Sequence, residues 1–75
     1  MDKNNFFHYR IVQNIAILST DTHGWTKEIN LISYNGALPK YDIRAWSPQH
    51  DKMGKGITLN KEELLQLKAV LQELL

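Results

Sequence analysis

The sequence predicts an α+β fold in which a four-stranded antiparallel sheet is followed by one C-terminal α-helix, in the order β-β-β-β-α. Three observations predict it. Apolar and polar residues alternate over short segments, an Asn-Gly dipeptide separates two of these segments, and leucines recur at helical spacing near the C-terminus. A period of two is typical of half-buried strands, and steps of three and four are typical of a helix. The chain has 75 residues and no internal linker, so we expect one domain over residues 1–75.

The first two strands are expected on either side of a polar turn. Residues 6–18 are rich in Phe, Tyr, Val and Ile and alternate in polarity, which predicts the first strand. This segment is long for one strand, so we expect a bulge or bend near residues 13–14. Residues 19–24 form the polar turn, and the second strand is expected over residues 25–34.

The next two strands follow a strong turn signal. Asn35-Gly36 predicts a hairpin turn, because both residues tolerate the positive φ that such turns need. The third strand is expected over residues 40–46. Residues 47–56 contain a proline and two glycines and predict a loop, which leaves residues 57–59 as a short fourth strand.

The C-terminal helix is expected over residues 61–75. Asn60 is a natural N-cap, and Glu63 three residues later completes a capping-box pattern. One stripe of leucines has coiled-coil spacing and consists of Leu64, Leu67, Leu71 and Leu74.

This leucine surface has two interpretations. Either all of it is intramolecular core, or one stripe covers the sheet while the other meets the same helix of a second subunit. A chain this short buries little surface on folding, which makes a monomer marginal and favours a homodimer through the helices.

Composition argues against several classes of protein. There is no cysteine, and His8, His23 and His50 do not have the short spacing of a zinc site, so we expect no metal and no cofactor. The longest apolar run, Ile15 to Leu18, is too short to cross a bilayer, and no signal-peptide pattern stands at the N-terminus. We therefore expect a cytoplasmic protein without a membrane partner, associated with the nucleoid if it is bacterial.

An enzyme is not expected. Ser19, Asp21 and His23 are the residue types of a catalytic triad, but in a tight turn they ordinarily bond to nearby backbone. A chain of this size also has little room for a substrate cleft and an oxyanion hole.

The third strand carries the main indication of nucleic-acid binding. The net charge is only +1, so any such contact must depend on how the charges are distributed. Alternation places Lys40, Arg44 and Trp46 on one outer face, together with Tyr34 from the second strand. Exposed aromatic rings among cations suit single-stranded nucleic acid, because bases stack on the rings and cations pair with phosphates. The alternative is that Trp46 folds back into a small second core.

Four further residues are candidate contacts. Lys52 and Lys55 flank glycines in the predicted loop, where backbone N–H groups could approach a phosphate; the alternative is an ordinary flexible basic loop. Trp25 and Lys27 come from the second strand. Strict alternation places these two on the face of Ile29, unless a bulge or the strand end reverses them.

Two segments resemble a known family. Residues 42–44 (DIR) and 55–59 (KGITL), followed by the capped helix, resemble the single-stranded DNA-binding domain of the positive cofactor four family of transcriptional coactivators, and especially its compact bacterial branch, the YdbC-like proteins. The likeness spans residues 40–70. It implies a sheet on one C-terminal helix, a homodimer with paired helices, and single-stranded DNA across the outer sheet faces.

The same resemblance implies roles for individual residues. Arg44 and Lys55 match DNA-contacting positions of the family, and Tyr34 falls where the family has an aromatic residue before the turn. Trp46 lies at, or one residue from, a stacking tryptophan. We therefore predict a non-enzymatic homodimer that binds single-stranded DNA with little sequence preference, in transcription regulation or another DNA transaction. Single-stranded RNA binding on the same face, and a protein-interaction module using the leucine helix without nucleic-acid affinity, remain open alternatives.

Overall fold

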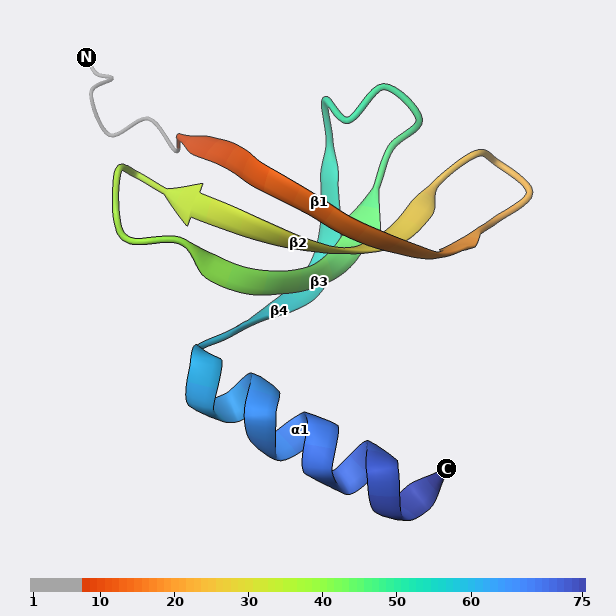
Figure 1. The fold of residues 1–75 in the computed structure, drawn as a ribbon. Coiled ribbons are helices and arrows are strands. Elements are labelled where there is room, and N and C mark those ends of the chain that lie inside the picture. Colours follow the sequence, from red (N-terminus) through yellow and green to blue (C-terminus); the bar gives the residue numbers. More distant parts are fainter. Residues whose placement is uncertain (1–7) are drawn as a thin grey trace.

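The computed structural model describes residues 8–75 and has the predicted architecture (Figure 1). Its elements are β1 (Tyr9–Thr20), β2 (Thr26–Tyr34), β3 (Lys40–Trp46), β4 (Met53–Leu59) and α1 (Lys61–Leu74). All neighbouring strands are antiparallel and form one sheet in the order β1-β2-β3-β4. The helix lies on one side of the sheet, and the loop between β3 and β4 rises on the other (Figure 1). The first two residues of the predicted strand 6–18 lie outside the described residues.

The first strand contains the irregularity expected near residues 13–14, with register shifts on both sides of these residues, and a further shift near its end. Its register against β2 shifts after Ile11, after Asn14 and after Ile17. At a bulge two residues oppose one, which bends the strand and increases its twist. These shifts interrupt the alternation along β1, so the continuous period-two pattern predicted for this segment was wrong.

The turn between β2 and β3 confirms the Asn-Gly prediction. Asn35 and Gly36 have φ angles of 52° and 76°, and the Ala37 N–H donates to the Tyr34 carbonyl at 2.9 Å. Positive φ at both central residues is the geometry that matches the twist of a hairpin. Asn35 also ties the turn to the start of β1, because its side-chain Oδ1 accepts from the His8 N–H at 2.8 Å.

The fourth strand begins at Met53, four residues earlier than predicted. The glycines that predicted a loop are instead part of this strand, and the only glycines with positive φ among the described residues are Gly24 and Gly36. Gly56 stands opposite Arg44, where an added Cβ would overlap the Arg44 Cβ. Glycine is present here because the backbones of β3 and β4 approach closely at this point. Such a close approach is a common reason for a glycine within a strand.

The helix begins as predicted. Asn60 Oδ1 accepts from the Glu63 N–H at 2.7 Å, and Glu63 Oε1 accepts from the Asn60 N–H at 2.8 Å. This reciprocal capping box satisfies two donors that would otherwise be unpaired at the helix start.

The helix is not packed tightly against the sheet. A groove of about 550 Å³ lies between them, lined almost wholly by apolar side chains: Leu18, Ile29, Ile43, Leu64, Leu67, Lys68, Leu71, Gln72 and Leu75. No residue of α1 is buried. In the leucine stripe predicted as a dimer seam, Leu64, Leu67 and Leu71 face this groove, whereas Leu74 is outside it and 72% exposed. No helix within the described range is long and apolar enough to span a membrane.

We expect Gly56→Ala to destabilise the protein by about 1–3 kcal/mol or more, because the methyl group must push β4 away from β3. Chemical denaturation followed by circular dichroism would measure this. Gly36→Asn is the matched control, since nothing lies within 4 Å of that site and asparagine tolerates positive φ. Equal stability of the two variants would contradict the proposed close approach.

Candidate nucleic-acid interface

A buried ion pair organises the outer face of the sheet, the face away from α1. The Asp42 carboxylate accepts from Arg44 Nε and Nη2, each at 2.8 Å, and from the Tyr34 hydroxyl at 2.7 Å. Arg44 Nη1 donates to the Gly54 carbonyl at 3.1 Å. Asp42 is fully buried, so this bidentate pair is a strong, geometrically specific contact. Arg44 therefore holds β4 to β3 in addition to carrying a charge.

The ion pair shifts the acidity of its partners. Burial, together with the hydrogen bond to Asp42, raises the pKa of Tyr34 to about 12. The hydrogen bond to Asp42 also raises the pKa of Arg44 above its usual range, against the effect of burial. Both side chains are thereby held in their protonated forms, as donors to one carboxylate.

A second polar cluster surrounds Glu28, which is also fully buried. Glu28 Oε1 accepts from Asn14 Nδ2 at 3.1 Å and from Asn30 Nδ2 at 3.2 Å. Glu28 Oε2 accepts from the Thr26 hydroxyl and lies 2.7 Å from His50 Nε2. Burial alone would raise the pKa of Glu28, but hydrogen bonds from Thr26, Asn30 and His50 hold it below its ordinary value of 4.5.

Sequence reasoning assigned no role to this cluster. The signal was present: Glu28 and Asn30 stand at alternate positions of β2, and Asn30 is opposite Asp42 on β3. Three polar residues on one face of two central strands indicate a buried polar layer once that face is known to be covered.

Trp46 is buried, and its expected exposure on the outer face was wrong. Its relative exposure is 0%, with Tyr9 tilted against the ring and His50 stacked on it at a centroid distance of 5.4 Å. The structure thus has the small second core that was the alternative for this residue. In this conformation no face of the indole is free for a base.

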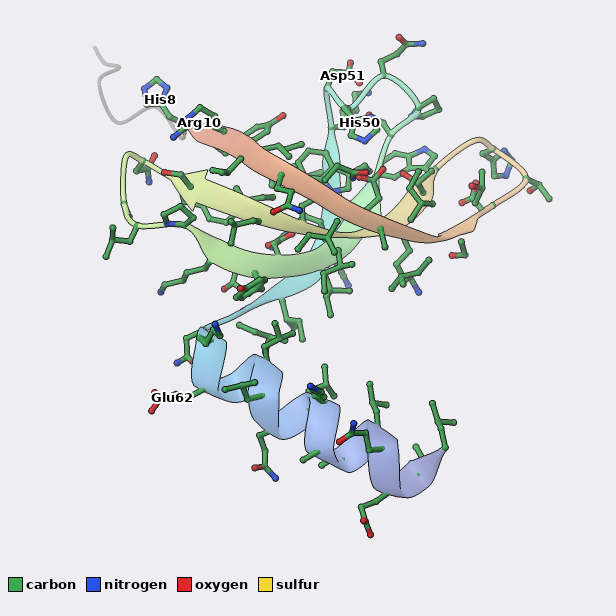
Figure 2. The ribbon with its side chains drawn as sticks, in the orientation of Figure 1. His8, Arg10, His50, Asp51 and Glu62 are labelled. Carbon is green, nitrogen blue, oxygen red and sulfur yellow. The ribbon has the colours of Figure 1, made fainter. Side chains whose placement is uncertain are left out.

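The loop between β3 and β4 is compact. The Ser47 hydroxyl donates to Asp51 Oδ1 at 2.8 Å and accepts from the Lys52 N–H at 2.9 Å, and the hydrogen bond from Ser47 lowers the pKa of Asp51. His50 has a φ of 59°. His50 and Asp51 therefore sit on an ordered turn above the sheet (Figure 2), with the Lys52 side chain exposed.

Two lysines meet on the helix side of the sheet, next to the backbone position of Arg44, whose guanidinium is turned to Asp42 on the outer face. Lys27, Arg44 and Lys55, from three neighbouring strands, line a concavity of about 390 Å³ together with Ile43, Gly56 and Ile57. We call it the cation concavity. No acidic residue of the described chain is among its lining residues. Its charge suits an anionic ligand.

Trp25 adjoins the cation concavity. It is half-buried, packs against Gly54, and shares a smaller hollow of about 190 Å³ with Lys27. Trp25 and Lys27 follow strict alternation, since Lys27 is opposite Ala45, two residues from Ile29.

The structure thus divides the predicted site residues into groups. Trp25, Lys27 and Lys55 lie together on the helix side. Tyr34, Arg44 and Trp46 are on the outer face. Lys52 is on the loop, and Lys40 is exposed near the opposite end of the sheet, opposite Ile32.

Asp21 and His23 of the triad-like set are turn residues, as the simpler interpretation held, whereas Ser19 is in β1, opposite Lys27, so the predicted turn begins two residues later than expected. Asp21 Oδ1 accepts from the backbone N–H groups of His23 and Trp25, at 2.8 and 3.0 Å. Such an Asx turn orders the β1–β2 connection. Over residues 8–75, no cluster of three histidine or acidic side chains is placed to hold a metal ion.

The fold and the cation concavity define a small α+β module with a surface suited to an anionic ligand. Residues 22–70 match the family described as Transcriptional Coactivator p15 (PC4), and the chain belongs to this family. Its members are non-enzymatic DNA-binding proteins. The chain is also similar to an uncharacterized protein of Treponema pallidum (strain Nichols), at 48% identity over 71 residues, covering 95% of this chain and 84% of that protein. The family prediction is confirmed; placement in the compact bacterial branch stays a prediction.

We expect Tyr34, one of the three tyrosines, to lose its proton at a higher pH than an ordinary tyrosine. A pKa raised to about 12 from 10.0 means that stabilisation from Tyr34 is present below pH 10 and is lost as pH rises from 10 toward 12. Ultraviolet absorbance of phenolate during an alkaline titration would resolve this component. Tyr34→Phe should remove it, whereas Tyr41→Phe should leave it in place. Joint titration of all tyrosines near pH 10 would contradict the Asp42 contact.

Proposed function

We propose that this protein is a homodimer that binds single-stranded DNA with little sequence preference, in transcription regulation or another DNA transaction. The observation that carries the proposal is the cation concavity, where the exposed side chains of Lys27 and Lys55 come together from β2 and β4. Membership of a DNA-binding family supports the same ligand. The concavity would receive backbone phosphates, which are common to every sequence.

The two lysines are the direct phosphate contacts in this proposal. Both side chains are exposed, and neither forms an ion pair within residues 8–75. Arg44 is already paired with Asp42 on the outer face, so it contributes to the wall of the concavity and not a free charge. Trp25, next to Lys27, would stack a base beside the bound phosphate.

The lysines outside the concavity would extend the path of the strand. Lys52 is on the loop leading into β4, and this loop meets the β1–β2 turn, because Pro48 lies close to Gly24. It therefore stands at the same end of the sheet as Trp25. Lys40, at the opposite end, would contact a more distant nucleotide.

A second copy of the chain is the proposed occupant of the apolar groove. An open groove of about 550 Å³ lined by leucines and isoleucines, beside a helix with no buried residue, is unfavourable in water. Leu74 and Leu75 are 72% and 95% exposed. The helix of a partner, carrying the same leucines, has the shape and chemistry to cover this surface symmetrically.

We expect Lys27→Gln and Lys55→Gln each to weaken binding of a labelled oligothymidine of about ten nucleotides, and to lower the slope of log affinity against log salt by about 0.7 per lost phosphate contact. Fluorescence anisotropy would measure both effects. Lys61→Gln, on the helix, is the matched control. Unchanged affinity in the double variant would overturn the assignment of the concavity as the binding site. A preference for a matched RNA oligomer in competition would indicate that the ligand is RNA and not DNA.

We expect the protein to sediment at twice its chain mass of 8.7 kDa at micromolar concentration. Leu71→Asp should abolish the dimer, because a carboxylate in the groove would lose hydration without gaining a partner. Glu62→Gln is the control, since Glu62 lies on the first turn, pointing away from the sheet (Figure 2). A wild-type chain that stays monomeric would contradict the proposed occupant.

A further inference from the structure

We propose that the protein covers Trp46, the residue predicted to stack on a base, with its own His50, and that a nucleobase displaces the imidazole. This inference rests on the proposed nucleic-acid function and adds a second, concealed contact to it. The site is on the outer face of the sheet, under the loop between β3 and β4, and is separate from the cation concavity on the helix side.

The imidazole already occupies the position that a base would take. Its ring lies 5.4 Å from the indole, centroid to centroid, with an interplanar angle of 25°. Tyr9, the other aromatic neighbour, is tilted by 53° and closes a different side of the ring. The His50 side chain is 42% exposed, whereas Trp46 has no exposure. The imidazole is therefore the outer layer between the indole and solvent.

The covered state retains two unfavourable features. Trp46 Nε1 is buried and has no acceptor within the described chain, although a buried indole N–H ordinarily finds one. His50 itself has a φ of 59°, a region that residues other than glycine rarely occupy. Displacing the loop would relieve the first, because Nε1 could then donate to water, to a phosphate or to a base carbonyl.

Few contacts hold the cover down. His50 Nε2 lies 2.7 Å from Glu28 Oε2, and the His50 carbonyl accepts from the Tyr9 hydroxyl at a longer 3.2 Å. The remaining polar contacts that order this loop, those of Ser47 with Asp51 and Lys52, are internal to it. The loop can therefore lift as a unit once His50 leaves Glu28 and Tyr9 and Pro48 leaves the β1–β2 turn at Gly24.

Proton uptake by His50 should close the cover. The titratable or charged groups near it in the described chain are Tyr9 from β1, Glu28 from β2, and Asp51 and Lys52 on its own loop. Trp46 of β3 is uncharged, and Arg44 is paired with Asp42. The nearest charge is thus the Glu28 carboxylate, which a protonated imidazole holds more strongly than a neutral one.

This makes the direction of the pH dependence diagnostic. Added positive charge ordinarily strengthens binding to a polyanion as pH falls. If protonation of His50 holds the imidazole over Trp46, binding at Trp46 instead becomes weaker as pH falls.

The test uses a Trp25→Phe background, so that Trp46 is the sole fluorescent tryptophan and an aromatic ring remains at position 25. We expect a short oligothymidine to quench Trp46, with affinity falling several-fold from about pH 8 to about pH 6. His50→Ala should bind several-fold more tightly at the lower pH and lose that fall. Glu28→Gln should also lose it, and His50→Phe should remain covered at both pH values. His23→Ala, a histidine in the neighbouring β1–β2 turn with no contact to Trp46 among the described interactions, should behave like the background.

The outcomes separate this inference from the proposed function. If a labelled oligomer shows no saturable binding at any pH, the proposed function fails. If the oligomer binds through Lys27 and Lys55 but Trp46 is never quenched, even in His50→Ala, only the covered site is overturned. Affinity that rises steadily with acid in all variants would overturn it as well.

Discussion

The whole structure depends on the fact that a four-stranded sheet has two faces and this chain has one helix. The helix lies on one side of the sheet (Figure 1) and does not fill even that side, because an apolar groove remains beneath it. The other side is covered by the chain's own bent β1 and the β3–β4 loop. As a result, part of the apolar surface on the helix side stays unfilled, and a layer of polar residues is buried on the other side.

The polar layer explains how a nearly neutral protein can carry a cationic surface. Glu28 and Asp42, two of the acidic side chains, are fully buried on the outer face, where hydrogen bonds satisfy them. Asp42 also orients Arg44 toward β4. With these carboxylates inside, Lys27 and Lys55 remain as unpaired charges on the helix side, so a net charge of +1 is compatible with a local anion-binding surface.

Local chemistry made much of the fold predictable. The hairpin at Asn35-Gly36 and the helix start at Asn60 were expected correctly, because each depends on residues adjacent in sequence. The alternation along β1 and the first residue of β4 were not predicted correctly. The bulges of β1 arise from pairing with β2, and Gly54 and Gly56 are in β4 because Ala45 and Arg44 of the neighbouring strand approach so closely. No local pattern distinguishes such glycines from loop glycines.

The sequence by itself determined the order of the elements, the ends of the helix, the family and the residue types available for binding. Only the tertiary structure decided which of those residues meet. It placed Trp25 and Lys27 beside Lys55, and it buried Trp46 beneath His50. The reason is that strand register, bulges and loop position are set by contacts between residues distant along the chain, and one shift of register moves a side chain to the opposite face of the sheet.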